Sequence, residues 1–197
     1  MLSGREHFYS DWQAQVRRVV EHGPVLDLGT PRPFNKHLAW LSSSCARPYF
    51  TSDIRAKPST TFTADASAIP LRDGSLGAVI CQGVLNYLTE PQRAVDEIWR
   101  VLRPGGQAYL SLTAAAPYTE GHLGFQGDVI RFTPASPDAL CERFTTVHVM
   151  KAGGLAQAAW NYLPEKMRVA PLQRIVNTLD TRFHTNVTMC IFVFATK

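Results

Sequence analysis

The sequence lacks the features that mark several classes of protein. It has no apolar run approaching the ~18 residues of a membrane-spanning helix. Residues 1–18 carry charges and no apolar stretch, which argues against a secretory signal, so we expect a cytoplasmic protein with no membrane span. No two cysteines form a CxxC pair, so no metal site is expected. The cysteines are Cys45, Cys81, Cys141 and Cys190.

Clustered positive charge is also missing. The formal net charge is +4, and the lysines and arginines are interspersed with acids. We therefore expect no nucleic-acid partner. The chain shows no internal repeat, and 197 residues that are 45% hydrophobic suffice for one domain with a buried core. We predict a single domain over 1–197, with an N-terminal helix in 1–22 and a substrate or lid loop in 114–136.

The hydrophobic pattern alternates between the periods of strands and helices. Phe8, Trp12 and Val16 recur at helical spacing over 5–22, in a helix that either packs on the sheet or closes over a cofactor. Thr89 and Gln92 have the spacing of a capping box. Strands are expected at 25–28, 48–53, 62–65, 77–81, 107–113, 145–150 and 186–196. Further helices are expected at 35–44, 89–102, 136–143, 155–163 and 172–179.

This alternation predicts an α/β fold. We expect a Rossmann-like sheet of about seven mostly parallel strands flanked by helices, with the last strand antiparallel. In such open sheets, ligands bind beyond the carboxyl ends of the strands. Gly29 ends the first expected strand and permits a close backbone approach. Asp53 ends the second and can accept hydrogen bonds from two ribose hydroxyls, while Asp65, after the third, can accept one from an adenine amine.

The order and spacing of these motifs resemble the class I S-adenosylmethionine-dependent methyltransferases, in particular the small-molecule group typified by ubiquinone-pathway enzymes. The segments VLDLG (25–29) and 65–112 carry the resemblance, and the second includes the RVLRPGG run of 100–106. It implies S-adenosylmethionine as cofactor and methyl transfer to oxygen, nitrogen or carbon of a small molecule. The implied cofactor-binding residues are Asp27, Gly29, Thr30, Arg32, Asp53, Ile54, Asp65, Ala66 and Gln82. Cys81 and Gly83 would flank the methyl-transfer face with Gln82.

The first motif departs from this family, which usually reads acid-x-Gly-x-Gly-x-Gly there. The chain instead has Pro31 and Pro33 in the loop after Gly29. Proline offers no backbone N–H, and a dinucleotide would need that backbone for its pyrophosphate. S-adenosylmethionine has no pyrophosphate, and Arg32 can offer a bidentate fork to its carboxylate. The loop therefore favours S-adenosylmethionine over NAD or FAD.

The residues expected at the acceptor lie mainly in the 114–136 loop. His122 is the candidate general base, because the Glu-His pair that relatives often carry near Asn86 is missing. Aligning nucleophile, methyl and sulfur can itself supply much of the rate. The residues expected to bind the acceptor are Tyr118, Asp128 and Arg131, and Tyr9 is a further candidate contact.

A weaker resemblance bears on the acceptor itself. The segment DxxRFT (128–133) and the pair Gly153-Gly154 resemble a subgroup associated with polysaccharide and secondary-metabolite biosynthesis, which favours a sugar or secondary metabolite as the acceptor.

The sequence leaves open whether the chain forms a homodimer. Two alternatives also stay open. One is a methyltransferase fold that catalyses a cyclisation or rearrangement, favoured by the loop prolines. The other is a non-catalytic partner subunit, favoured by the missing Glu-His pair and the short chain.

Overall fold

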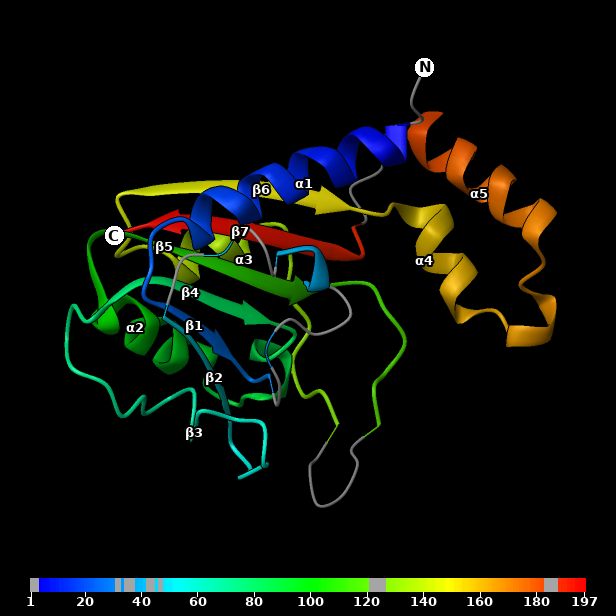
Figure 1. Cartoon of the computed structure of the whole chain (residues 1–197). Coiled ribbons are helices and arrows are strands. Elements are labelled where there is room, and N and C mark those ends of the chain that lie inside the picture. Colours follow the sequence, from blue (N-terminus) through cyan, green and yellow to red (C-terminus); the bar gives the residue numbers. More distant parts are fainter. Residues whose placement is uncertain are drawn as a thin grey trace.

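The fold is a seven-stranded sheet with helices on both faces (Figure 1). The computed structural model describes residues 4–30, 33, 38–41, 45, 48–120, 127–182 and 188–197. The strands are β1 (Val25–Leu28), β2 (Tyr49–Asp53), β3 (Phe62–Thr63), β4 (Leu76–Gln82), β5 (Leu102–Thr113), β6 (Thr146–Ala152) and β7 (Cys190–Thr196). Their order is β3-β2-β1-β4-β5-β7-β6, and β7 pairs antiparallel with both of its neighbours while β1 to β5 pair in parallel. The predicted α/β fold with an antiparallel last strand is confirmed.

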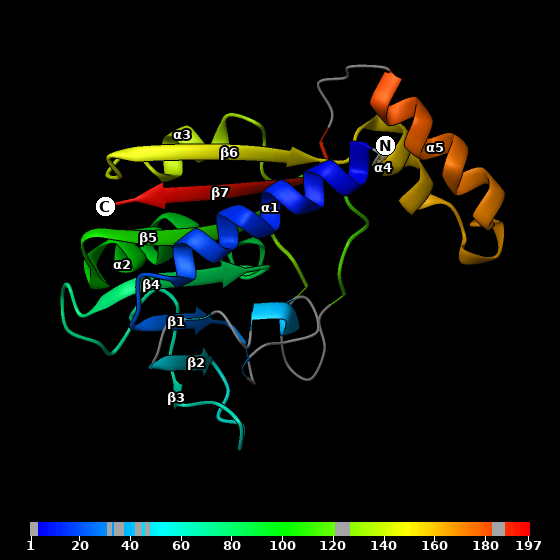
Figure 2. The same cartoon turned by 45° about the horizontal axis from the view of Figure 1, so that its top comes forward.

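The helices divide between the two faces of the sheet. The long helices are α1 (Gly4–Val20), α2 (Pro91–Val101), α4 (Leu155–Tyr162) and α5 (Ala170–Arg182), with a short α3 (Ser136–Leu140). Short 3-10 turns occur at η1 (Ala39–Leu41), η2 (Leu85–Tyr87) and η3 (Glu165–Met167). Helix α1 lies across one face, whereas α4 and α5 project beyond the sheet, on the side to which the arrows of β1, β4 and β5 point (Figures 1 and 2). Within the described residues, no helix is long and apolar enough to cross a bilayer.

Alternation along the strands builds two separate cores. In β4, Val79 and Cys81 join the core that contains α2, whereas Ala78 and Ile80 join the core under α1. This is the period-two pattern of a sheet buried on both faces. The Trp12 indole N–H donates to the Tyr109 hydroxyl at 3.1 Å, from α1 to β5. Helix α1 is therefore a packing helix, the first of the two roles considered for it.

The predicted capping box is wrong. Helix α2 begins at Pro91, its N-cap is Glu90, and the Glu90 side chain makes no capping hydrogen bond. A box with Thr89 as N-cap would need Glu90 in helical conformation, which the following proline disfavours; its φ and ψ are −125° and 69°. The Gln92 amide instead donates to Asp96 and to the Leu140 carbonyl, each at 3.2 Å.

Four further boundaries differ from expectation. Strand β5 begins at Leu102 instead of at 107, so the Pro104-Gly105-Gly106 run lies within the strand and does not separate it from the helix. The run falls in the irregular part of β5, where the register jumps from Leu76↔Leu102 to Ala78↔Gln107. Strand β3 is shorter than 62–65, and β7 begins at Cys190 rather than at 186. Of the helix expected over 35–44, the described part is the turn η1 with Leu38 and Leu41 buried, and the rest lies outside the described residues.

Candidate functional site

The turn after β1 brings the ends of three strands together. Gly29 has a φ of +79°, a conformation that L-residues with a side chain rarely adopt. A Cβ at this position would lie 2.2 Å from Cγ2 of Val84, which follows β4. The Thr30 amide donates to the Ser52 carbonyl in β2 at 2.9 Å. Gly29 is therefore required both by the turn and by the close packing of the segments after β1 and β4.

Replacing Gly29 by alanine tests that requirement. We expect a loss of about 1–2 kcal/mol in the free energy of unfolding from the left-handed conformation, and an additional loss because Val84 must move. The matched control is Gly83→Ala, since Gly83 has a φ of +68° but no heavy atom of the described residues within 4 Å of an added Cβ. Urea denaturation of both variants should show the larger loss for Gly29→Ala; equal losses would contradict the packing argument.

Asp27 is the buried acid of the site. It is fully buried in β1, and the Tyr49 hydroxyl donates to its Oδ2 at 2.7 Å. Its Oδ1 meets no donor at hydrogen-bonding geometry among the described residues, although the Thr30 side chain is close enough to lower the pKa. Burial outweighs both neighbours and raises the pKa of Asp27 to about 6. The carboxylate is thus held charged at neutral pH at a cost to stability.

Buried oxygens without partners gather at the carboxyl ends of the strands. Within the described part of the chain they are Asp27 Oδ1, Ser52 Oγ and Gln82 Oε1, from β1, β2 and β4. Leu28 pairs with Ser52 on one side and with Cys81 on the other, so these strand ends are neighbours. Buried polar atoms almost always find a partner. These three oxygens therefore indicate a site where a polar ligand or ordered water supplies the missing hydrogen-bond partners.

Asp53 and Asp65 stand at the outer part of the same edge. Asp53 ends β2, where its Oδ1 accepts from the Arg55 amide at 2.9 Å. Asp65 follows β3, where its Oδ1 accepts from the Ser67 amide at 2.8 Å. Each of these hydrogen bonds closes a local turn and fixes the orientation of the carboxylate. A carboxylate has acceptor sites in addition to the one used in such a bond. Ala66 and Ile54 are the neighbouring residues that were also predicted to bind the cofactor. Ala66 is buried beside Asp65, and Ile54 is half exposed.

Asp128 and Arg131 connect the two sides of the 114–136 loop. They form an ion pair, and the Arg131 guanidinium also donates to the carbonyls of Ala116 and Pro117, at 3.2 and 3.0 Å. The Asp128 amide donates to the Thr119 carbonyl at 3.1 Å. These bonds join residues 116–119, on the outgoing side of the loop, to residues 128–131, on its returning side. The nearby Tyr118 is 62% exposed, so its ring is open to a ligand.

Two predicted residues lie outside the described part of the chain. These are Arg32, the expected partner of a cofactor carboxylate, and His122, the expected general base. The roles of both stay predictions. Tyr9, the further candidate contact, lies on α1 and is 47% exposed. Its ring meets Trp12 edge-on at 6.4 Å.

Asn86 is a buried residue of the site that sequence reasoning missed. Its side-chain amide donates to the carbonyls of Thr113 and Ile130, at 3.2 and 2.8 Å, and its Oδ1 accepts from the Thr113 amide at 3.1 Å. Its own carbonyl accepts from the amides of Val129 and Ile130. Asn86 therefore connects η2 to the end of β5 and to Val129 and Ile130, on the returning side of the 114–136 loop. Its partners lie 27 and 44 residues away, so no local pattern could have identified it.

The thiol of Cys81 does not act as a nucleophile at the carboxyl edge of the sheet. Cys81 is fully buried, and burial raises its pKa to about 12, so the thiol stays protonated at neutral pH. In the part of the chain that the structure describes, no group of three His, Cys, Asp or Glu side chains could hold a metal ion. The described site offers carboxylates, backbone groups and the Gln82 amide, which suit binding and orienting a polar nucleoside.

Comparison with known proteins finds a methyltransferase domain in the middle of the chain. The sequence model of a methyltransferase-domain family matches residues 43–110. The match covers β2, β3, β4 and most of β5 and starts beyond the loop with Pro31 and Pro33. It therefore rests on the part of the site that contains Asp53 and Asp65.

Curated relatives match only part of their length. The tRNA (carboxymethyluridine(34)-5-O)-methyltransferase ALKBH8 of Macaca fascicularis is 34% identical over 105 residues, which is 47% of this chain and 16% of that protein. For the corresponding mouse protein the matched share is 22%. The chain thus spans less than a quarter of the first relatives it matches.

Solved structures share the whole fold. A SAM-dependent methyltransferase from Archaeoglobus fulgidus superposes with a TM-score of 0.63 at 12% identity, over 98% of this chain and 95% of that one. The (4+2)-cyclase SpnF superposes with a TM-score of 0.56 at 15% identity, over 94% of this chain and 79% of that one. At such identities the likeness shows the fold alone. Together with the matched domain, it supports a class I S-adenosylmethionine-dependent methyltransferase fold.

Proposed function

We propose that the chain transfers a methyl group from S-adenosylmethionine to a small-molecule acceptor. The observation that carries the proposal is the placement of Asp53 and Asp65 at the ends of adjacent strands, beside the Gly29 turn. The family match covers the segment that contains both acids.

The residues present fit S-adenosylmethionine. Asp53 would accept from the ribose hydroxyls, and Asp65 from the adenine amine. The charge of Asp27 lies at the end of β1, next to the loop expected to hold the amino-acid end, and it favours an ammonium group there. The cofactor supplies a sulfonium-activated methyl group when bound. The chain's own part is to hold the acceptor in line with that methyl group and to keep water away.

The acceptor is a small molecule in this proposal, with a sugar or secondary metabolite favoured by the DxxRFT and Gly153-Gly154 segments. The curated relative named above acts on tRNA by its name, but this chain has no run of basic residues to follow a phosphate backbone. Tyr118, Asp128 and Arg131 border the acceptor side, and His122 is the proposed base. We place the protein in the cytoplasm and leave open whether it is a homodimer.

A second candidate function is cyclisation or rearrangement without methyl transfer. Two observations favour it: the prolines that replace the loop glycines, and the likeness of the fold to the cyclase SpnF. In that case the same pocket would bind a ligand and shape its path without a methyl acceptor. A non-catalytic partner subunit is the third possibility, and it predicts no cofactor binding.

Thermal and chemical denaturation with added S-adenosylmethionine test the proposal. A ligand at a hundredfold excess over its Kd should raise the free energy of unfolding by about 2.7 kcal/mol. NAD is the control ligand and should produce no shift, because the loop lacks the backbone for a pyrophosphate. An Asp53→Ala variant should lose most of the response. No shift with the wild-type chain would contradict the proposal and favour the partner subunit.

Incubation with radiolabelled S-adenosylmethionine separates the remaining candidates. Methyl transfer to sugars or to a panel of hydroxylated metabolites is the expected result. Transfer to tRNA in place of these would overturn the small-molecule acceptor. Binding without transfer to either class would favour the cyclisation alternative.

A further inference from the structure

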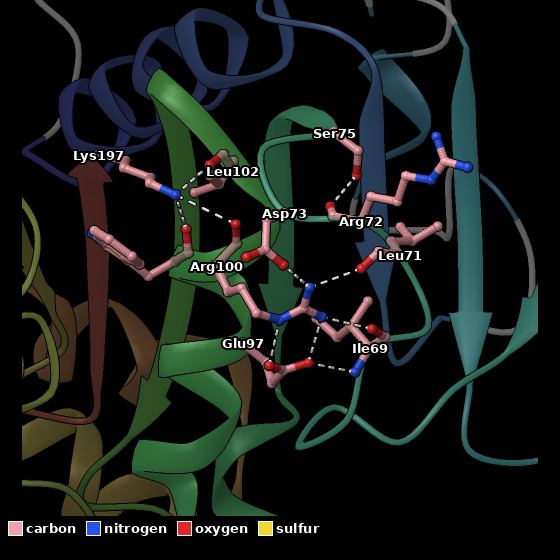
Figure 3. A network of polar contacts seen from close by, with 10 residues as sticks. Ile69, Leu71, Arg72, Asp73, Ser75, Glu97, Arg100, Leu102 and Lys197 are labelled. Atoms are coloured by element: carbon pink, nitrogen blue, oxygen red, sulfur yellow. Dashed lines mark hydrogen bonds and ion pairs between the residues drawn. The ribbon is translucent and has the colours of Figure 1, made fainter.

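Arg100 makes an unusually complete set of hydrogen bonds in the last turn of α2 (Figure 3). Its Nε and Nη2 donate to the two oxygens of Glu97, at 2.6 and 2.8 Å. Its Nη1 donates to the carboxylate of Asp73 at 2.5 Å and to the Leu71 carbonyl at 2.8 Å. Its Nη2 also donates to the Ile69 carbonyl at 2.8 Å. A guanidinium has five N–H donors, and these five bonds account for all of them.

Arg100 and Glu97 hold the backbone of Ile69 from both sides. The Ile69 carbonyl accepts from Arg100, and the Ile69 amide donates to Glu97 Oε2 at 2.8 Å. The Arg100 hydrogen bonds lower the pKa of Glu97, so the pair is charged at neutral pH. Charge-assisted, bidentate contacts of this kind fix geometry as well as adding energy. The segment from Ile69 to Leu71 is therefore clamped to α2.

The clamp begins directly after the turn that contains Asp65. The Ser67 amide donates to Asp65 Oδ1, and the Ala68 amide donates to the Asp65 carbonyl at 3.0 Å. Ala66 and Ile69 are buried at 7% and 3% exposure in the core beneath α2. Between Asp65 and the clamp there is thus a short, hydrogen-bonded turn anchored by two buried side chains. A shift at Ile69 would be passed to Asp65.

The helix end that carries Arg100 is itself fixed. The Lys197 ammonium donates to the carbonyls of Trp99 and Leu102, at 2.8 and 2.6 Å, at the C-terminal end of α2 (Figure 3). Those carbonyls have no partner within the helix, and a cation there is favourable. Arg100 lies just before the start of β5, so it is remote from the carboxyl edge where the ligand is proposed to bind. Any effect on the ligand must act through the 65–71 segment.

We infer that Arg100 is a positioning residue for the nucleoside end of the site: it sets where the Asp65–Ala66 turn stands and so controls recognition of the adenine amine. This inference rests on the proposed S-adenosylmethionine site. A purely structural Arg100 would lower stability and weaken all ligands by a common factor. A positioning Arg100 would reduce the discrimination between a base with the amine and a base without it.

The test measures that discrimination with two product analogues by calorimetry. S-adenosylhomocysteine carries the amine, and S-inosylhomocysteine carries an oxygen in its place. The wild-type chain should bind S-adenosylhomocysteine at least about tenfold more tightly than S-inosylhomocysteine. This is the effect expected for the loss of one good hydrogen bond to a charged acceptor. Arg100→Met should reduce the ratio to within about threefold. Arg93→Met is the matched control, because Arg93 lies on the same helix and its only ion-pair partner among the described residues is the exposed Glu90; it should keep the wild-type ratio.

Each outcome separates the inference from the proposed function. If the wild-type chain binds neither analogue, the proposed cofactor site fails. If it binds both without preference, or if Arg100→Met keeps the preference, the positioning role is overturned while the site stands. Should Arg100→Met fail to fold, Glu97→Gln replaces it, since the amide keeps the shape but loses the charge. A Glu97→Gln variant that folds and retains full discrimination also overturns the inference.

Discussion

Replacing Asp27 by asparagine is expected to stabilise the chain at pH 7 by about 1–3 kcal/mol. Burial raises the pKa of this carboxyl from 3.8 to about 6. Above that pH the charged carboxylate therefore lowers the free energy of unfolding. Asparagine has nearly the same shape and carries no charge. Its oxygen can still accept from Tyr49, and its amide faces the Thr30 hydroxyl that lowers the pKa of Asp27.

The pH dependence follows from the sign of the shift. Because the folded pKa is the higher one, the folded state retains a proton between about pH 4 and 6 that the unfolded state has lost. The cost of the charged Asp27 is therefore complete above pH 6 and disappears as the pH falls toward 4. Urea denaturation at pH 7.5 and pH 4.5 should show a gain for Asp27→Asn that is much larger at pH 7.5. An equal gain at both values would contradict the assignment.

The same substitution should weaken S-adenosylmethionine binding at pH 7.5, because the charge that costs stability is the one proposed to attract the cofactor's ammonium group. A protein that keeps a destabilising buried charge usually does so for function. Asp27→Asn that gains stability and retains full affinity would remove Asp27 from the binding residues while leaving its burial cost intact. Calorimetry on the stabilised variant distinguishes the two results.

Replacing Asn86 by alanine is expected to lower the free energy of unfolding by about 3 kcal/mol. The substitution removes three side-chain hydrogen bonds and leaves the Thr113 amide and the Ile130 carbonyl without these partners. Asn86 is only 2% exposed, so water cannot readily replace them. The loss should be accompanied by earlier proteolytic cleavage within 114–136, whose returning side Asn86 holds through Ile130.

Asn161→Ala is the control for Asn86→Ala. Asn161 is partly exposed. Among the described residues, its side-chain amide donates only to the Met189 sulfur at 3.5 Å, and its side-chain oxygen accepts from Gln157. We expect a loss below about 1 kcal/mol there. If both variants lose stability equally, or if Asn86→Ala leaves the cleavage rate unchanged, Asn86 does not hold the loop.

The elements that were predicted well have local causes. Strand β1 occupies the expected residues because its apolar run ends at a glycine turn, and β4 because a continuous apolar run marks a strand buried on both faces. The strand-end acids Asp53 and Asp65 followed from the same pattern, because the carboxyl ends of parallel strands meet at one edge. The capping box failed because the preference of Glu90 before a proline overrode the spacing of Thr89 and Gln92.

The sequence by itself determined the fold class and the edge at which the ligand is proposed to bind, because both follow from periodicity and from residues that end strands. Only the tertiary structure decided the electrostatics and the rigidity of that edge. The pKa of Asp27 depends on burial between neighbouring strands, and Asn86 and Arg100 act through partners 27 to 44 residues away. Contacts between residues so distant in the chain exist only once the sheet and its helices have packed together.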